Sequence, residues 1–92
     1  MKEISLTPSK LALVARVSDE DFDRINTHLW RARWNKKTQS YYAVREEGIG
    51  AARKTIYMAR EIMQTPKGMI CDHINHKTLD NQRENLRNCT HQ

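Results

Sequence analysis

The sequence predicts a small α+β domain in which short helices accompany a small antiparallel sheet. Its 92 residues allow one domain, or two very small units that share a core. The spacing of apolar residues changes from a helical period over residues 19–28 to a period of two over residues 30–45. Short apolar segments bounded by turn-forming residues continue as far as residue 73, and these predict further strands.

The first predicted elements are a strand and a helix. Residues 10–17 form an apolar run, which predicts a short buried strand. Ser18 is a good N-cap residue, and the acidic residues after it suit the positive end of a helix dipole. Apolar side chains then recur at spacings of three and four. We therefore expect a helix over residues 19–28, with an apolar stripe formed by Phe22, Ile25 and Leu29.

Residues 30–45 predict a β-hairpin that carries positive charge. Two strands, residues 30–36 and 40–45, flank a polar turn and contain aromatic and β-branched residues. Trp30 and Trp34 share one face, and we expect both in the core. A basic face of this kind can follow a DNA groove, and an ordinary charged outer face is an equally good interpretation. The candidates for nucleic-acid contact are Arg31, Arg33, Lys36, Lys37 and Arg45.

The chain then predicts a third strand over residues 54–57 and one or two helical turns over residues 58–63. A turn containing Pro and Gly separates these from a strand over residues 69–73, which leads into a polar segment. We therefore divide the chain into an N-terminal α+β region with the basic hairpin, residues 1–66, and a C-terminal motif, residues 67–92.

Composition favours a polyanionic partner and a reducing compartment. The formal net charge is +5, with 16 Lys and Arg against 11 Asp and Glu. A basic balance favours nucleic acid through counterion release. No apolar run is long enough for a transmembrane helix, and the N-terminus lacks the apolar stretch of a signal peptide. Two cysteines are too few for a disulfide scaffold, so we expect a cytoplasmic protein.

The C-terminal motif combines residue types suited to phosphodiester hydrolysis. A neutral His73 is a natural base for water near pH 7, and Asp72 is a natural oxygen ligand for Mg²⁺. Neighbouring residues of a strand point to opposite faces, so these two address one site only where the strand breaks into a loop. The polar segment 75–85 supplies that break, and the amide of Asn85 can pin the loop.

The run DHINHKTLDNQRENLR resembles the HNH (His-Me finger, ββα-metal) homing endonucleases of phages and mobile elements, and the likeness extends over nearly all of the chain. The resemblance implies metal-dependent cleavage or nicking of double-stranded DNA with Mg²⁺ or Mn²⁺. By this likeness His73 is the general base, Asp72 a metal ligand and Asn85 the residue that orients the loop. Arg87 is a candidate for contact with phosphate.

Two departures from that family bear on activity. Ala59 stands where these proteins usually carry His. The family's second strand, here about residues 86–90, is followed by a helix that presents the last metal ligand, and the matching residue would lie beyond Gln92. We therefore expect an HNH motif without its final helix, in either a shortened chain or a natural short form.

Two functions from different classes follow. The first is an HNH endonuclease acting in a bacterial or phage-infected cell. The second is a catalytically inactive, nuclease-derived phage protein that binds DNA or occupies a host nuclease or CRISPR effector, in the manner of anti-CRISPR inhibitors. The two differ in whether His73 is needed for activity.

Overall fold

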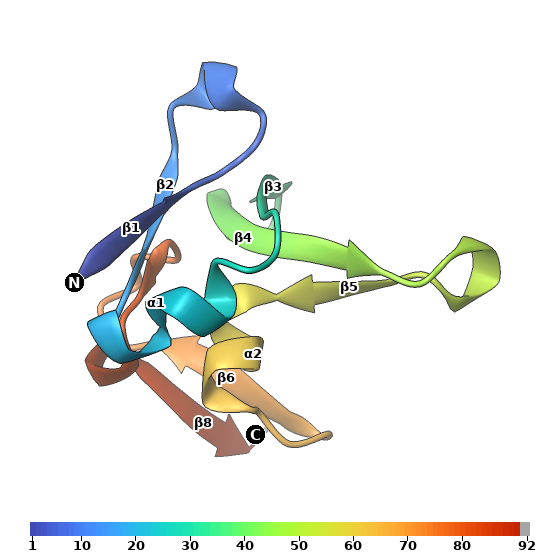
Figure 1. The fold of residues 1–92 in the computed structure, drawn as a ribbon. Coiled ribbons are helices and arrows are strands. Elements are labelled where there is room, and N and C mark those ends of the chain that lie inside the picture. Colours follow the sequence, from blue (N-terminus) through green and yellow to red (C-terminus); the bar gives the residue numbers. More distant parts are fainter. Residues whose placement is uncertain (91–92) are drawn as a thin grey trace.

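A computed structural model describes residues 1–90, over which the chain forms three small sheets and two short α-helices (Figure 1). The predicted α+β class is confirmed. Figure 1 shows the two helices near the centre of the molecule, with the sheets arranged around them. None of the helices in this part of the chain is long and apolar enough to span a membrane.

The first sheet combines two strands from the start of the chain with one short strand from its last quarter. Strand β1 (Lys2–Ser5) is antiparallel to β2 (Val14–Val17), and the short β7 (Asp80–Asn81) is parallel to β2. The sequence predicted neither β1 nor β7. The strand predicted over residues 10–17 is wrong in its first half, where a 3₁₀ turn, η1 (Ser9–Leu11), stands instead. Ala12 ends this turn in the left-handed conformation, which interrupts extended backbone, so the strand begins only at β2.

The second sheet contains the predicted hairpin and the predicted third strand. Strands β3 (Arg31–Asn35), β4 (Ser40–Glu47) and β5 (Lys54–Tyr57) are antiparallel in that order. The Asn35 side chain closes the hairpin turn, because its oxygen accepts hydrogen bonds from the Lys37 and Thr38 backbone. A second 3₁₀ turn, η2 (Gly50–Ala52), connects β4 to β5.

Both helices are short, and the length predicted for the first was too great. Helix α1 (Asp19–Ile25) ends three residues before the predicted end at residue 28, and Leu29 is 88% exposed, so it is not part of the buried stripe. The indole of Trp30 donates a hydrogen bond to the Ile25 carbonyl, which fixes the chain as it leaves the helix. Helix α2 (Met58–Met63) follows β5 directly, as predicted.

The third sheet is an antiparallel pair, β6 (Met69–His73) and β8 (Leu86–Thr90), which lies beside α2 (Figure 1). A loop leaves β6 after His73, passes through β7, and enters β8 by a 3₁₀ turn, η3 (Arg83–Asn85). The C-terminal motif is therefore two strands connected by a long loop, and the loop contributes β7 to the first sheet.

A single core unites these parts. Side chains from the sheets and from both helices are buried together, and the largest are Trp30, Ile25, Met58, Ile62 and Val17. Leu86 belongs to the same cluster, so the segments 1–66 and 67–92 share one core. Trp34 is 52% exposed and packs edge-on against Tyr41, so the prediction that both tryptophans are in the core is wrong for Trp34.

Candidate functional site

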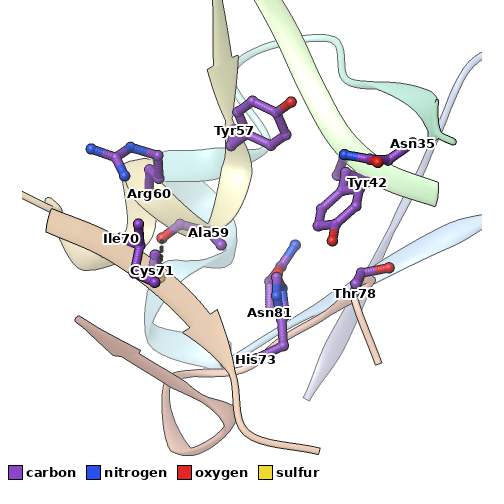
Figure 2. Close-up of a pocket in the computed structure, with 11 residues that line it drawn as sticks. Asn35, Tyr42, Tyr57, Ala59, Arg60, Ile70, Cys71, His73, Thr78 and Asn81 are labelled. Carbon is purple, nitrogen blue, oxygen red and sulfur yellow. Dashed lines mark hydrogen bonds between the residues drawn. The ribbon is translucent and has the colours of Figure 1, made fainter. Parts of the chain in front are cut away.

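The ring of His73 is held by a buried amide. His73 ends β6 and is 8% exposed, and its Nε2 lies 2.7 Å from the side-chain oxygen of Asn81, which is 1% exposed (Figure 2). An amide oxygen can only accept a hydrogen bond, so Nε2 carries the proton. In the neutral ring the lone pair is then on Nδ1, which is the nitrogen able to accept a proton.

Sequence reasoning missed Asn81. This residue contacts His73 because β7 pairs in parallel with β2, with Asn81 opposite Val17. A two-residue strand has no readable hydrophobic period, and its partner is more than sixty positions away. No local signal in the sequence distinguishes Asn81 from the other amides of the loop.

Asn85 braces the loop and makes no hydrogen bond to the His73 ring within residues 1–90. Its side-chain oxygen accepts from the Asn75 backbone at 2.9 Å, and its amide nitrogen donates to the Asp80 carbonyl at 2.8 Å. Its own carbonyl accepts from the Ile74 backbone. Asn85 is buried, and it connects the start and the middle of the polar segment to the start of β8.

Asp80 also holds this loop, through its side-chain carboxylate. Its carboxylate accepts hydrogen bonds from the side chains of Gln82 at 2.8 Å and Asn75 at 3.1 Å. Partial burial acts to raise the pKa of Asp80, but the hydrogen bonds from Gln82 and then Asn75 outweigh it, so that this pKa lies below its usual value. The loop is therefore ordered around an ionised carboxylate.

Asp72 and His73 line one surface cavity of about 310 Å³, with His76 on its rim. The Asp72 carboxylate lies opposite Arg87 in the β6–β8 pairing and accepts from the guanidinium Nη2 at 3.0 Å and Nε at 3.3 Å. Both side chains are partly exposed, so solvent weakens the ion pair. Arg87 therefore competes with any cation for this carboxylate.

The donors in this cavity are expected to hold a divalent cation weakly until substrate phosphate is also present. Within residues 1–90, no three His, Cys, Asp or Glu side chains lie close enough together to hold a metal. Asp72 supplies a hard oxygen, and Mg²⁺ commonly binds through one or two carboxylates while waters and substrate phosphate complete its shell. The donor set agrees with a weak cation site that becomes tighter when phosphate binds.

The basic residues of the hairpin do not form one surface. Arg45 packs over the Trp30 ring, with 5.5 Å from its guanidinium carbon to the ring centre, and pairs with Glu61 at 2.7 Å. Arg31 is paired with Glu46, and the hydrogen bonds from Arg31 and then Thr55 hold the pKa of that carboxyl below its usual value. Both guanidiniums are thus paired with carboxylates of the protein, Arg45 in a mostly buried position and Arg31 in a partly exposed one.

The remaining basic candidates of the hairpin are exposed. Arg33 reaches across the sheet to the Thr55 hydroxyl at 3.3 Å, and Lys36 and Lys37 lie in the turn after β3. Arg33 stands opposite Tyr42 in the β3–β4 register, and the Tyr42 ring is 6.2 Å from the His73 ring. This part of the hairpin is therefore on the same side of the molecule as the His73 cavity.

Comparison with known proteins agrees with this geometry. Residues 64–92 match the family model described as HNH endonuclease. No curated protein and no solved structure matches the chain. The matched segment contains β6, the braced loop and β8, including Asp72, His73 and Asn85. Residues 64–92, which we call the HNH segment, are therefore similar to HNH endonucleases.

Proposed function

We propose that this protein is an HNH-type endonuclease that cuts or nicks double-stranded DNA. The observation that carries the proposal is the contact of Asn81 with His73, which leaves Nδ1 free to accept a proton in a residue that lines the Asp72 cavity. His73 takes the proton from a water molecule as the water oxygen bonds to phosphorus, and the bond from phosphorus to the leaving sugar oxygen breaks.

Asp72 is the proposed ligand for a divalent cation, Mg²⁺ or Mn²⁺, that would stabilise charge on the phosphate and the leaving oxygen. Arg87, which holds Asp72 in the free protein, is the proposed contact for the same phosphate. A phosphate that attracts the guanidinium also releases the carboxylate. DNA binding and cation binding are therefore expected to support each other.

The proposed DNA surface extends from this cavity along the hairpin. Arg33, Lys36 and Lys37 supply exposed positive charge, and Arg31 and Arg45 stabilise the sheet that presents it. Contacts of this kind position a duplex through its phosphates without reading its sequence. A cytoplasmic location in a bacterial or phage-infected cell would give the protein access to DNA.

Plasmid nicking tests the proposal. Supercoiled plasmid is incubated with the protein and Mg²⁺ or Mn²⁺, and His73→Ala is expected to lower the nicking rate by at least about 100-fold, because a general base contributes roughly 10²–10⁴-fold. Asn81→Ala keeps the base but removes its acceptor, so a smaller loss is expected. His28→Ala, at an exposed histidine outside the site, is the matched control. Nicking by His73→Ala at the rate of the unmodified protein would sink the proposal.

A second candidate is a binding protein that has lost turnover. The pairing of Asp72 with Arg87 favours it, because a carboxylate held by an arginine is a poorer cation ligand. The partner would be DNA itself or a host nuclease or CRISPR effector, as for an anti-CRISPR inhibitor. Salt-dependent duplex binding without nicking, unchanged in His73→Ala, would support a DNA-binding role. A stoichiometric complex with such an effector, equally insensitive to His73→Ala, would support inhibition.

A further inference from the structure

A second cavity lies beside the His73 site, between the β4–β5 strands on one side and β6 with the start of α2 on the other (Figure 2). Its volume is about 260 Å³, and its walls are mostly apolar. Figure 2 shows Tyr42 and Tyr57 on one side of this space, with Ala59 and Cys71 on the other. We call this space the aromatic cavity.

The small side chain of Ala59 keeps the aromatic cavity open. Ala59 is in the first turn of α2 and is buried, and its carbonyl faces the Cys71 thiol at 3.7 Å. Burial raises the pKa of that thiol, which therefore stays neutral and acts as an apolar wall. A larger residue at position 59 would occupy the space that separates α2 from the tyrosines.

The two tyrosines present aromatic surface to this space. Tyr42 and Tyr57 meet edge to face at 5.9 Å between ring centres, so their rings do not stack on each other. Tyr42 also meets the His73 ring edge-on. Aromatic side chains in such positions can stack with a flat heterocycle.

Polar groups at the edge of the cavity have hydrogen-bonding capacity to spare. The Asn35 oxygen serves the hairpin turn, which leaves its amide NH₂ available, and Arg60 uses one guanidinium nitrogen on the Met69 carbonyl. Within residues 1–90, neither tyrosine hydroxyl has a hydrogen-bond partner. A ligand with its own donors and acceptors can therefore form specific hydrogen bonds at this edge.

The aromatic cavity adjoins the Asp72 cavity, because both are lined by Tyr42, Cys71, His73 and Thr78. A nucleotide has this same arrangement, with a charged phosphate joined through the sugar to a flat, uncharged base. We propose that the aromatic cavity binds an unstacked nucleobase adjacent to the phosphate that is cut. This inference rests on the proposed nuclease function, and it adds a base-binding subsite to it.

The energetics agree with a base as occupant. Removing a base from a duplex costs unstacking energy, and nucleic-acid enzymes recover this cost by stacking the base on aromatic side chains in a fitted pocket. The mostly apolar wall suits the flat base. The phosphate is expected near Asp72, which lines the other cavity and holds the Arg87 guanidinium at 3.0 Å. The base is therefore expected inside, with the sugar and phosphate outside.

Nucleotide titration followed by NMR tests the subsite without relying on cleavage. Deoxyadenosine monophosphate and deoxycytidine monophosphate are expected to shift the amide signals of Tyr57, Ala59 and Cys71, whereas deoxyribose 5-phosphate, which lacks a base, leaves these unchanged. Ala59→Leu fills the cavity and is expected to weaken nucleotide binding at least about tenfold, which is the range for loss of one base stack. Ala51→Leu makes the same change at an exposed alanine and is the matched control.

Two outcomes would overturn the subsite: equal shifts from the sugar phosphate, or nucleotide binding by Ala59→Leu as tight as that of the unmodified protein. Tyr57→Leu, at a partly exposed position, is a second variant that weakens binding without filling the core, should Ala59→Leu unfold. Nucleotide binding without plasmid nicking leaves the subsite supported while the nuclease proposal fails. If the protein nicks plasmid but Ala59→Leu binds nucleotide as tightly as the unmodified protein, the nuclease proposal is supported and the subsite fails.

Discussion

Arg87 and Asp72 face each other across β6 and β8, and their contact determines how readily a cation reaches the carboxylate. Arg87→Ala is expected to tighten Mn²⁺ binding in the absence of DNA by about 1.4- to fivefold, since exposed ion pairs of this kind are worth roughly 0.2–1 kcal/mol. The free Mn²⁺ signal in electron paramagnetic resonance measures this. Arg16→Ala, which removes the same charge from an exposed arginine, is the control.

Arg87→Ala is also expected to bind duplex DNA more weakly, because it loses a phosphate contact. The salt dependence of its DNA binding should be smaller by about one counterion. Equal Mn²⁺ affinities for Arg87→Ala and Arg16→Ala would contradict the competition between arginine and cation. Asp72→Asn, which removes the ligand itself, is expected to abolish the Mn²⁺ binding that the other two variants retain.

At the residue scale, the sequence indicated that Asp72 and His73 lie at one place, but it did not indicate the contacts that orient them. Asp72 and His73 line one cavity because β6 ends at His73, as the polar segment after it implied. The partner of His73 is Asn81, and this contact depends on a parallel pairing between distant segments. The ion pairs of Arg31 and Arg45 could not be predicted from the sequence either, because an ion pair depends on which carboxylate the fold brings near.

Among the elements, the loop between β6 and β8 depends most on charge. Asp80 begins β7 and receives hydrogen bonds from Gln82 and Asn75. Its pKa is lowered in the folded protein, because these hydrogen bonds outweigh the effect of burial. A carboxyl with a lowered folded-state pKa stabilises the fold above its unfolded pKa and loses this contribution as the pH falls through the folded value.

We therefore expect Asp80→Asn to lower the free energy of unfolding by about 1 kcal/mol at pH 7, the usual scale for such hydrogen bonds. The difference from the unmodified protein should shrink as the pH falls below the ordinary value of 3.8 and the native carboxyl becomes protonated. Urea unfolding followed by circular dichroism at pH 7, 4 and 2.5 measures this. A difference that stays constant with pH would contradict it, and Asp23→Asn at an exposed carboxyl is the control.

Elements with a clear period were predicted well, and those determined by distant pairing were not. The hairpin strands, β5, α2 and β6 all carry apolar or aromatic patterns within their own residues, whereas β8 was predicted from the resemblance to HNH endonucleases. Strand β1 has a single buried apolar residue, Ile4, and β7 has two residues, so neither presents a pattern. The end of α1 was misplaced because Leu29 continues the helical spacing although the chain has already turned at Ile25.

For the whole molecule, a buried carboxylate links the N-terminal region to the HNH segment. Asp21 of α1 is 2% exposed, and it accepts from Arg83 at 2.9 Å through two guanidinium nitrogens and from Arg24 at 3.0 Å. The Ser18 hydroxyl, at the helix N-cap position, accepts from the Arg83 backbone at 3.0 Å instead of capping its own helix. Helix α1 and the turn before β8 are thus held by the same residues.

Because this link and the shared core involve both segments, the protein is expected to unfold in one transition, and Asp21→Ala is expected to destabilise all of it. Removing one member of a buried ion pair leaves the charge of the other member uncompensated, at a cost of about 3–5 kcal/mol. Arg83 and Arg24 are partly exposed and can turn to solvent, so we expect the lower end, about 3 kcal/mol. Urea unfolding is monitored by tryptophan fluorescence in a Trp34→Phe background, which leaves Trp30 as the emitting residue, and by amide exchange of β8, and both should show the same loss of stability. A smaller midpoint shift at β8 than at Trp30 would mean that the HNH segment folds independently of α1, and Asp23→Ala, on the exposed side of the helix, should leave both unchanged.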